Sequence, residues 1–260
     1  MHETTDHGLG AEQAFFDQEA ALLDEGQLLI PPDQVERYRH ARPAPLNSPK
    51  DALFYRLLPL DGKRVLDYGC GHGENACLLA ACGARVCAFD LSPASILRAN
   101  QRAEAHGLAD RIRFDVFAAG RADYPRASFD VITGFAILHH LHHSLPAIYA
   151  EIDRLLAPHG IACFIEPVAN SATLRVLRRL TPLSANATPD ERQLRYAEIQ
   201  QIQNYGFRSV RFQHFYCVER LHRVLGEWSR PSLRWADHHA QRVFPFLRPL
   251  YGTVLVTAER

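Results

Sequence analysis

The sequence of 260 residues has no surplus of either charge and is poor in lysine, with Lys50 and Lys63 its only two. Its 29 basic and 29 acidic side chains balance when the 14 histidines are counted as neutral. A general nucleic-acid-binding protein needs excess Lys and Arg to displace counterions from phosphates. The charge balance therefore argues against that class, although histidine protonation makes the zero provisional.

Long hydrophobic runs and paired cysteines are lacking as well. No apolar run approaches the roughly 20 residues of a membrane-spanning helix, and the N-terminal segment MHETTDHGLGAEQ is too polar for a signal peptide. The six cysteines form no CxxC pair and lie mostly in apolar stretches. This pattern favours buried thiols over a disulfide framework or a metal site. We expect a cytoplasmic protein without a metal.

Between residues 63 and 167, short apolar segments alternate with helical ones. The predicted strands are RVLDYG, ARVCAFD, RIRFDVF, FDVITGFA and GIACFIEP. The segment SPASILRANQRAEAHG between two of them has Ser92 and Pro93 at its start and Gly107 at its end, as helices often do. Short strands without polar alternation, separated by helices, predict a parallel sheet covered on both faces. Right-handed crossovers make it a doubly wound, Rossmann-like α/β sheet.

The flanks of this region are less regular. We expect helices over 11–24, around 35–41 and over 48–58, and assign 1–58 as an N-terminal lid or substrate segment before a domain over 59–260. Tyr38, Phe54 and Tyr55 would form a lid or pack in the core. Helical insertions over 168–205 and 218–250 are expected to serve the substrate or an interface.

Two parts of these insertions are singled out by composition. The cluster Arg175, Arg178 and Arg179 would meet an acidic substrate, but a solvated helix face is favoured. The stretch RVFPFLRPLYG mixes aromatics with Arg. We predict its burial against the sheet, with peripheral contact to a membrane or a partner subunit as the alternative. A homodimer is left open.

The strongest local signal is the segment VLDYGCGHG at residues 65–73. An acid ends a strand and glycines follow at alternate positions, which lets the backbone turn sharply and approach a ligand. The dinucleotide fingerprint G-x-G-x-x-G would require glycine where Glu74 stands, and no GK[ST] of a P-loop follows. The pattern predicts a nucleoside ligand without phosphates, carrying a cationic or zwitterionic part that tolerates Asp67.

A second acid supports the nucleoside prediction. Asp90 ends the second strand, 23 residues after Asp67, near the spacing of about 20 at which an acid binds ribose hydroxyls. The alternative is that Asp90 caps the next helix. Ser92 already fills that position, so the ribose role is favoured.

The motifs together resemble the class I S-adenosylmethionine (SAM)-dependent methyltransferases. VLDYGCGHG, AFDLSP, SFDVITGFAILHHL and LLAPHGIACFIEP match four family motifs in order over roughly residues 60–167. The resemblance implies a seven-stranded, mostly parallel sheet with an antiparallel last strand and SAM as cofactor. The cofactor-binding positions that it implies, with Leu91 packing on adenine, are Asp67, Gly69, Cys70, Gly71, Asp90, Leu91 and Gly134.

One position departs from that family pattern. Members usually carry an Asp after the third strand that contacts the adenine amino group, and here Ala118 stands there. Asp115 lies three residues earlier and is expected to point elsewhere. We expect the backbone around Phe117 and Ala118 to hold the adenine instead.

Candidate residues for the chemistry follow the fourth and fifth strands. The resemblance places a functional His at His140, our first candidate for a general base, with His139 second. Both could instead only brace their loop or contact the cofactor. Glu166 ends the fifth strand, at the edge where ligands bind in such sheets, and would orient a substrate group or pair with an Arg. His72 is expected to be structural or adjacent to the cofactor.

We therefore predict a methyltransferase acting on a small organic molecule, with the product S-adenosylhomocysteine (SAH). O-methylation is favoured, and C- or N-methylation is close behind. No NPPY-like amino-methylation motif follows the fourth strand. The alternatives are methylation of a protein or carrier-bound substrate, a reaction coupled to methylation, and a non-catalytic SAM-binding protein.

Overall fold

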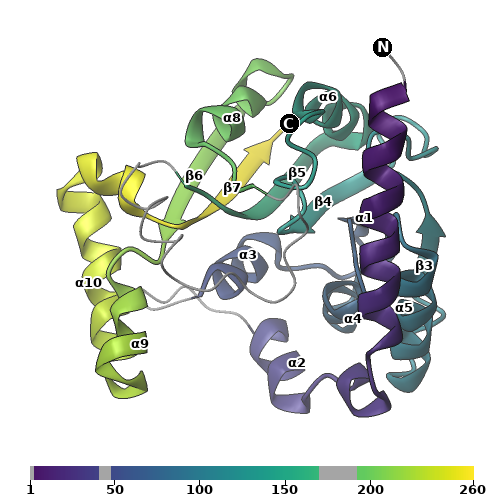
Figure 1. Ribbon diagram of the computed structural model, residues 1–260, viewed down its shortest axis with the longest axis horizontal. Coiled ribbons are helices and arrows are strands. Elements are labelled where there is room, and N and C mark those ends of the chain that lie inside the picture. The colour runs from purple at the N-terminus through teal and green to yellow at the C-terminus, as the bar shows by residue number, and fades with distance from the viewer. Residues whose placement is uncertain (1–2, 41–47, 170–191) are drawn as a thin grey trace.

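The computed structural model describes residues 3–40, 48–169 and 192–260 and centres on one seven-stranded sheet (Figure 1). The strand order is β3-β2-β1-β4-β5-β7-β6. Neighbours are parallel from β3 to β5, and β7 runs antiparallel to both β5 and β6. The predicted mostly parallel sheet with an antiparallel last strand is confirmed. The strands are β1 (Arg64–Tyr68), β2 (Arg85–Asp90), β3 (Ile112–Val116), β4 (Phe129–Phe135), β5 (Leu156–Pro167), β6 (Ser209–Phe215) and β7 (Thr253–Glu259).

Helices cover both faces of the sheet. Their starts follow local chemistry: the Ser92 hydroxyl accepts the N–H of Ser95 at 2.9 Å, and Pro93 fills the first turn, as predicted. Pro32 opens a helix a few residues before the predicted position around 35. The helices are α1 (Glu3–Ala21), α2 (Pro32–Arg39), α3 (Pro49–Leu57), α4 (Glu74–Ala81), α5 (Pro93–Ala105), α6 (Leu145–Leu155), α8 (Tyr196–Gln200), α9 (His222–Leu225) and α10 (Arg230–Val243).

Two apolar cores lie on opposite faces of the sheet, because successive strand residues point to opposite sides. Val65 and Val131 pack with α3, α4 and α5 on one face. Leu66 and Ile132 pack with α6 and the segment 194–202 on the other. This double coverage explains why the parallel strands lack polar alternation.

Two of the three N-terminal aromatic residues pack in the core. Tyr38 and Phe54 are buried and stack with ring centroids 4.4 Å apart, whereas Tyr55 is exposed. A lid role for Tyr55 stays a prediction. No helix in the described ranges is both long enough and apolar enough to cross a lipid bilayer.

The segment between β6 and β7 corrects one prediction. Val243 and Phe246 of the stretch RVFPFLRPLYG are 66% and 73% exposed, so the predicted burial of this stretch against the sheet is wrong, although its Tyr251 is fully buried. Most of the stretch lies in the turn Pro245–Leu250, which has no buried residue, and the preceding α10 attaches to the body through polar side chains. The cluster Arg175, Arg178 and Arg179 lies outside the described residues.

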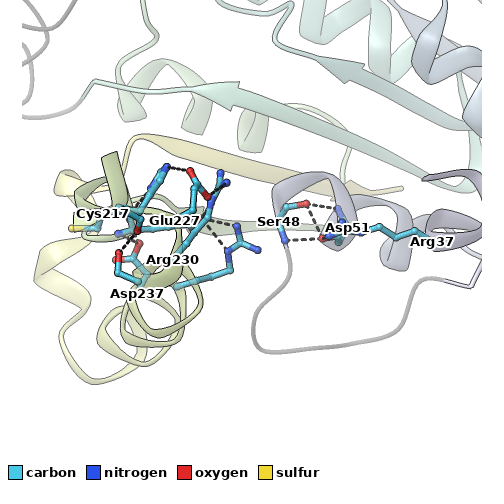
Figure 2. A network of polar contacts seen from close by, with 12 residues as sticks. Arg37, Ser48, Asp51, Cys217, Glu227, Arg230 and Asp237 are labelled. Atoms are coloured by element: carbon cyan, nitrogen blue, oxygen red, sulfur yellow. Dashed lines mark hydrogen bonds and ion pairs between the residues drawn. The ribbon is translucent and has the colours of Figure 1, made fainter. Parts of the chain in front are cut away.

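Asp237 is the main anchor of α10 (Figure 2). Its buried carboxylate accepts the backbone N–H groups of Cys217, Val218 and Glu219 at 2.8–3.0 Å. Tyr216 directly before them has φ +66°, an uncommon value for a non-glycine residue. The carboxylate thus stabilises a strained turn and ties the helix to the end of β6.

Candidate cofactor and acceptor site

The carboxyl ends of β1, β2 and β4 meet at one edge of the sheet, and the glycine loop after β1 lies there. Gly69 and Gly71 have φ of +72° and +49°. A Cβ on Gly69 would approach the Ile137 side chain to 2.5 Å, so this glycine is required by packing. A Cβ on Gly71 would meet nothing within 4 Å. The backbone at Gly71 is therefore open to a ligand, as its motif predicts.

Asp67 lies beneath this loop as a fully buried carboxylate. Within the described part of the chain, neither of its oxygens accepts a hydrogen bond of good geometry. Burial raises the pKa of Asp67 to about 7, while the charge of Lys50 and the backbone amide of Ala76 lower it by smaller amounts. Such a group gains from a cationic or hydrogen-bond-donating ligand.

Replacing Asp67 with Asn should raise the free energy of unfolding at pH 8 by about 2–4 kcal/mol without ligand. The folded pKa exceeds the ordinary value of 3.8. The contribution of Asp67 to the stability of the fold is thus most favourable below about pH 4, and it is lost as the pH rises through about 7. Urea unfolding at pH 4 and pH 8 measures the effect. Asp130→Asn is the control of opposite sign, because hydrogen bonding to Arg64 lowers the pKa of Asp130. Equal stability of Asp67→Asn and wild type at pH 8 would contradict this assignment.

Asp90 stands at the end of β2, beside the glycine loop. Its carboxylate accepts the N–H of Gly71 at 2.9 Å and the N–H of Ser92 at 3.0 Å. Each carboxylate oxygen has a second lone pair for a ligand hydroxyl. Asp90 therefore shapes the glycine loop and is placed to bind a diol, while burial raises its pKa.

The positions expected near adenine have mixed surroundings. The Phe117 N–H donates to the Asp90 carbonyl at 3.1 Å, so this amide is already used. Ala118 is half-buried next to it. Asp115 accepts from Arg113 and from the Tyr124 hydroxyl, at 2.9 and 2.7 Å, and so points away as expected.

Three other predicted positions differ in what they offer a ligand. Burial raises the pKa of Cys70 well above its ordinary value, so the thiol stays neutral. Leu91 is half-buried after β2 and can present an apolar surface. A Cβ on Gly134 would lie 2.7–2.8 Å from Phe164 and Ile137, so this glycine has a packing role.

Glu166 and His139 brace the loop after β4. The buried Glu166 carboxylate accepts the N–H groups of Ile137, Leu138 and His139 at 2.8–3.3 Å, and it contacts His139 Nδ1 at 3.0 Å. Ala136 before them has φ +56°. The geometry thus favours a positioning role for Glu166, and neither predicted partner, a substrate group or an Arg, is needed to explain it.

His140 faces a different partner. Its Nδ1 lies 3.1 Å from Glu12 Oε1 on α1, and its ring meets Phe16 edge to face at 5.6 Å. Asp17 of the same helix accepts the Ser92 hydroxyl and the Ala94 N–H, so α1 lies beside the end of β2. Glu12 was missed by the sequence reasoning, because nothing in a polar helix marks the residue that reaches His140.

Lys50 is the second residue that the sequence reasoning missed. Its ammonium pairs with Glu74 at 2.7 Å and lies 5.4 Å from the Tyr38 ring and 5.8 Å from that of Phe135. It therefore sets a cation beside the carboxylates of Glu74 and Asp67. The scarcity of lysine could have drawn attention to this residue, since the chain has only two lysines. His72 lies half-buried in the glycine loop, where its carbonyl accepts from Arg102 at 2.7 Å.

The sequence is similar to those of known methyltransferases. A family model described as a methyltransferase domain matches residues 38–227. The chain is 38% identical to 27-O-demethylrifamycin SV methyltransferase of Amycolatopsis mediterranei over 40% of this chain and 39% of that protein. It is 34% identical to a sterol 24-C-methyltransferase of Pneumocystis carinii over 39% and 27%. The chain spans less than half the length of these relatives.

Solved structures give the same fold. The cyclase SpnF superposes with a TM-score of 0.57 at 23% identity, over 81% of this chain and 79% of that one. The family model covers well over half of the sequence, including the glycine loop, Asp90 and the loop after β4. On that match, the chain belongs to the methyltransferase domain family.

Proposed function

We propose that the protein binds SAM at this sheet edge and transfers its methyl group to a small organic molecule. The observation that carries the proposal is the buried Asp67 carboxylate, which accepts no hydrogen bond of good geometry from the described residues, beneath an open glycine backbone with Asp90 at the neighbouring strand end. These groups fit a cationic nucleoside without phosphates. The names of the relatives, which include O- and C-methyltransferases, agree with this chemistry.

The residues present suit each part of SAM. Asp67 would accept from the methionine ammonium, and Lys50 would face the methionine carboxylate. Asp90 would hold the ribose hydroxyls through its remaining lone pairs. When bound, SAM supplies an activated methyl on a sulfonium, so the protein has to align a nucleophile and exclude water.

His140 would act as the general base in this proposal. A carboxylate can only accept, so pairing with Glu12 puts the hydrogen on Nδ1 and leaves Nε2 with a lone pair. Nε2 would take the proton from an acceptor hydroxyl as the oxygen attacks the methyl. This arrangement suits O-methylation, because the hydroxyl loses its proton as the oxygen is methylated.

Replacing His140 with Ala should lower kcat by about 10²–10⁴-fold, because positioned bases contribute that much. The pH dependence attributable to the base should disappear, while affinity for SAM stays unchanged. Rates measured between pH 6 and 9 check this. Glu12→Gln should cause a smaller loss, since the amide no longer fixes the tautomer, and full activity of His140→Ala over this range would refute the role.

Transfer of labelled methyl to a panel of phenols, alcohols, amines and activated carbon acids tests the proposed reaction. We expect label on hydroxyl acceptors. Label on carbon or nitrogen alone would overturn the preference for oxygen. Binding of SAM without transfer to any of these acceptors would overturn small-molecule methylation itself.

A further inference from the structure

Helix α10 attaches to the protein by its polar side. Arg230, Arg234, Asp237 and Gln241 follow one another at spacings of three or four, which puts them on one helix face. Arg230 and Arg234 both pair with the buried Glu219, and Asp237 holds three backbone amides (Figure 2). A surface helix normally turns its apolar stripe to the core. In α10 the polar face is turned to the body of the protein instead, so the apolar face is turned outward.

The outward face carries large apolar side chains. Trp228, Trp235 and Phe246 are 82%, 55% and 73% exposed. Trp235 lies on α10, Trp228 in the short turn before it, and Phe246 in the turn Pro245–Leu250 after it. Val243 and Phe244 add to the exposed surface. Exposed aromatics gathered in one region of the surface usually mark an interaction site.

Two cations belong to the same segment: Arg242 lies in the last turn of α10, and Arg248 lies in the turn after it, where its charge acts on Tyr196 and His214. Arg242 and Arg248 are exposed and form no ion pair within the described ranges. The exposed acid of the region, Glu227, is paired with Arg230 at 3.0 Å. The exposed residues Trp228, Trp235, Arg242, Phe246 and Arg248 of this segment are called here the aromatic–arginine face, and with Glu227 paired their summed charge is positive.

The charge decides between two occupants of this face. In a symmetric dimer the face would lie on its own copy, bringing Arg242 and Arg248 against like charges. An anionic lipid surface instead complements the arginines, and tryptophan and phenylalanine insert at the boundary between headgroups and acyl chains. We propose that the aromatic–arginine face docks the protein on an anionic membrane surface.

Co-sedimentation with phosphatidylcholine vesicles, with and without phosphatidylglycerol, tests the proposal on the full chain. Binding to the anionic vesicles that weakens with added salt is expected. The double variant Trp235→Ala, Phe246→Ala should bind at least about tenfold more weakly. Arg242→Gln and Arg248→Gln should each weaken binding about fivefold.

Matched controls come from α5 and from the start of β2. Figure 1 shows α5 on the side of the molecule away from α10, and β2 lies near the end of the sheet opposite to β6. Leu97→Ala removes an exposed apolar side chain and Arg85→Gln an exposed cation, and both should bind like wild type. No wild-type binding to anionic vesicles, or unchanged binding by the double variant, would overturn the proposal. So would a dimer that the double variant dissociates. No methyl acceptor enters the assay, so its result does not depend on the proposed function.

Discussion

Replacing Asp90 with alanine is expected to weaken binding of SAM and SAH by at least about 100-fold. Two hydrogen bonds from ribose hydroxyls to a charged acceptor would be lost, each worth about 1.5–3 kcal/mol. The Gly71 and Ser92 amides would also lose their acceptor, which loosens the glycine loop. Isothermal titration calorimetry of both ligands measures the change.

A control must separate ligand binding from folding. Asp115→Ala removes an acid from the neighbouring strand β3, where the side chain pairs with Arg113 and Tyr124. We expect this variant to bind SAH nearly as wild type does. Asp90→Asn keeps one acceptor oxygen and should lie between the two. If folded Asp90→Ala binds with wild-type affinity, Asp90 is not the ribose ligand.

Replacing Glu166 with alanine should lower the free energy of unfolding by about 3–5 kcal/mol. The buried carboxylate accepts three successive backbone amides and faces His139, and the variant leaves these donors without their acceptor. The left-handed Ala136 would lose the contacts that hold its turn. Urea unfolding followed by circular dichroism measures the loss.

Glu259→Gln provides a comparison for Glu166. Glu259 ends β7 and pairs with the half-exposed Arg211, and such pairs contribute about 0–1 kcal/mol. A loss below 1 kcal/mol for Glu166→Ala would show that the loop does not depend on the carboxylate. Glu166→Gln should retain part of the stability, since its amide oxygen still accepts.

The sequence allowed the parts of the site that are local along the chain to be predicted. The glycine loop and the Ser92 cap each depend on residues within a few positions of one another, and Asp90 follows Asp67 at a spacing of 23 residues, so spacing along the chain carries the information. The pairing of Glu12 with His140 joins residues 128 positions apart, and Lys50 meets Glu74 across two helices. Neither contact leaves a periodic pattern.

The prediction for the C-terminal stretch was wrong for a related reason. An amphipathic helix shows two faces, and the sequence does not say which one meets the body. In α10 the polar face meets the body. The reason is that Glu219 pairs with Arg230 and Arg234, and Asp237 accepts backbone amides after β6. Composition alone therefore favoured burial of Phe246, because aromatic side chains are usually inside.

Titration of the wild-type protein with SAH and, separately, with NAD⁺ tests the central claim most directly. Both ligands contain an adenosine, but only NAD⁺ carries a pyrophosphate, which Glu74 would oppose at the start of α4. We predict saturable binding of one SAH per chain and no binding of NAD⁺. Binding of NAD⁺, or a folded protein that gives no heat with SAH, would contradict the account.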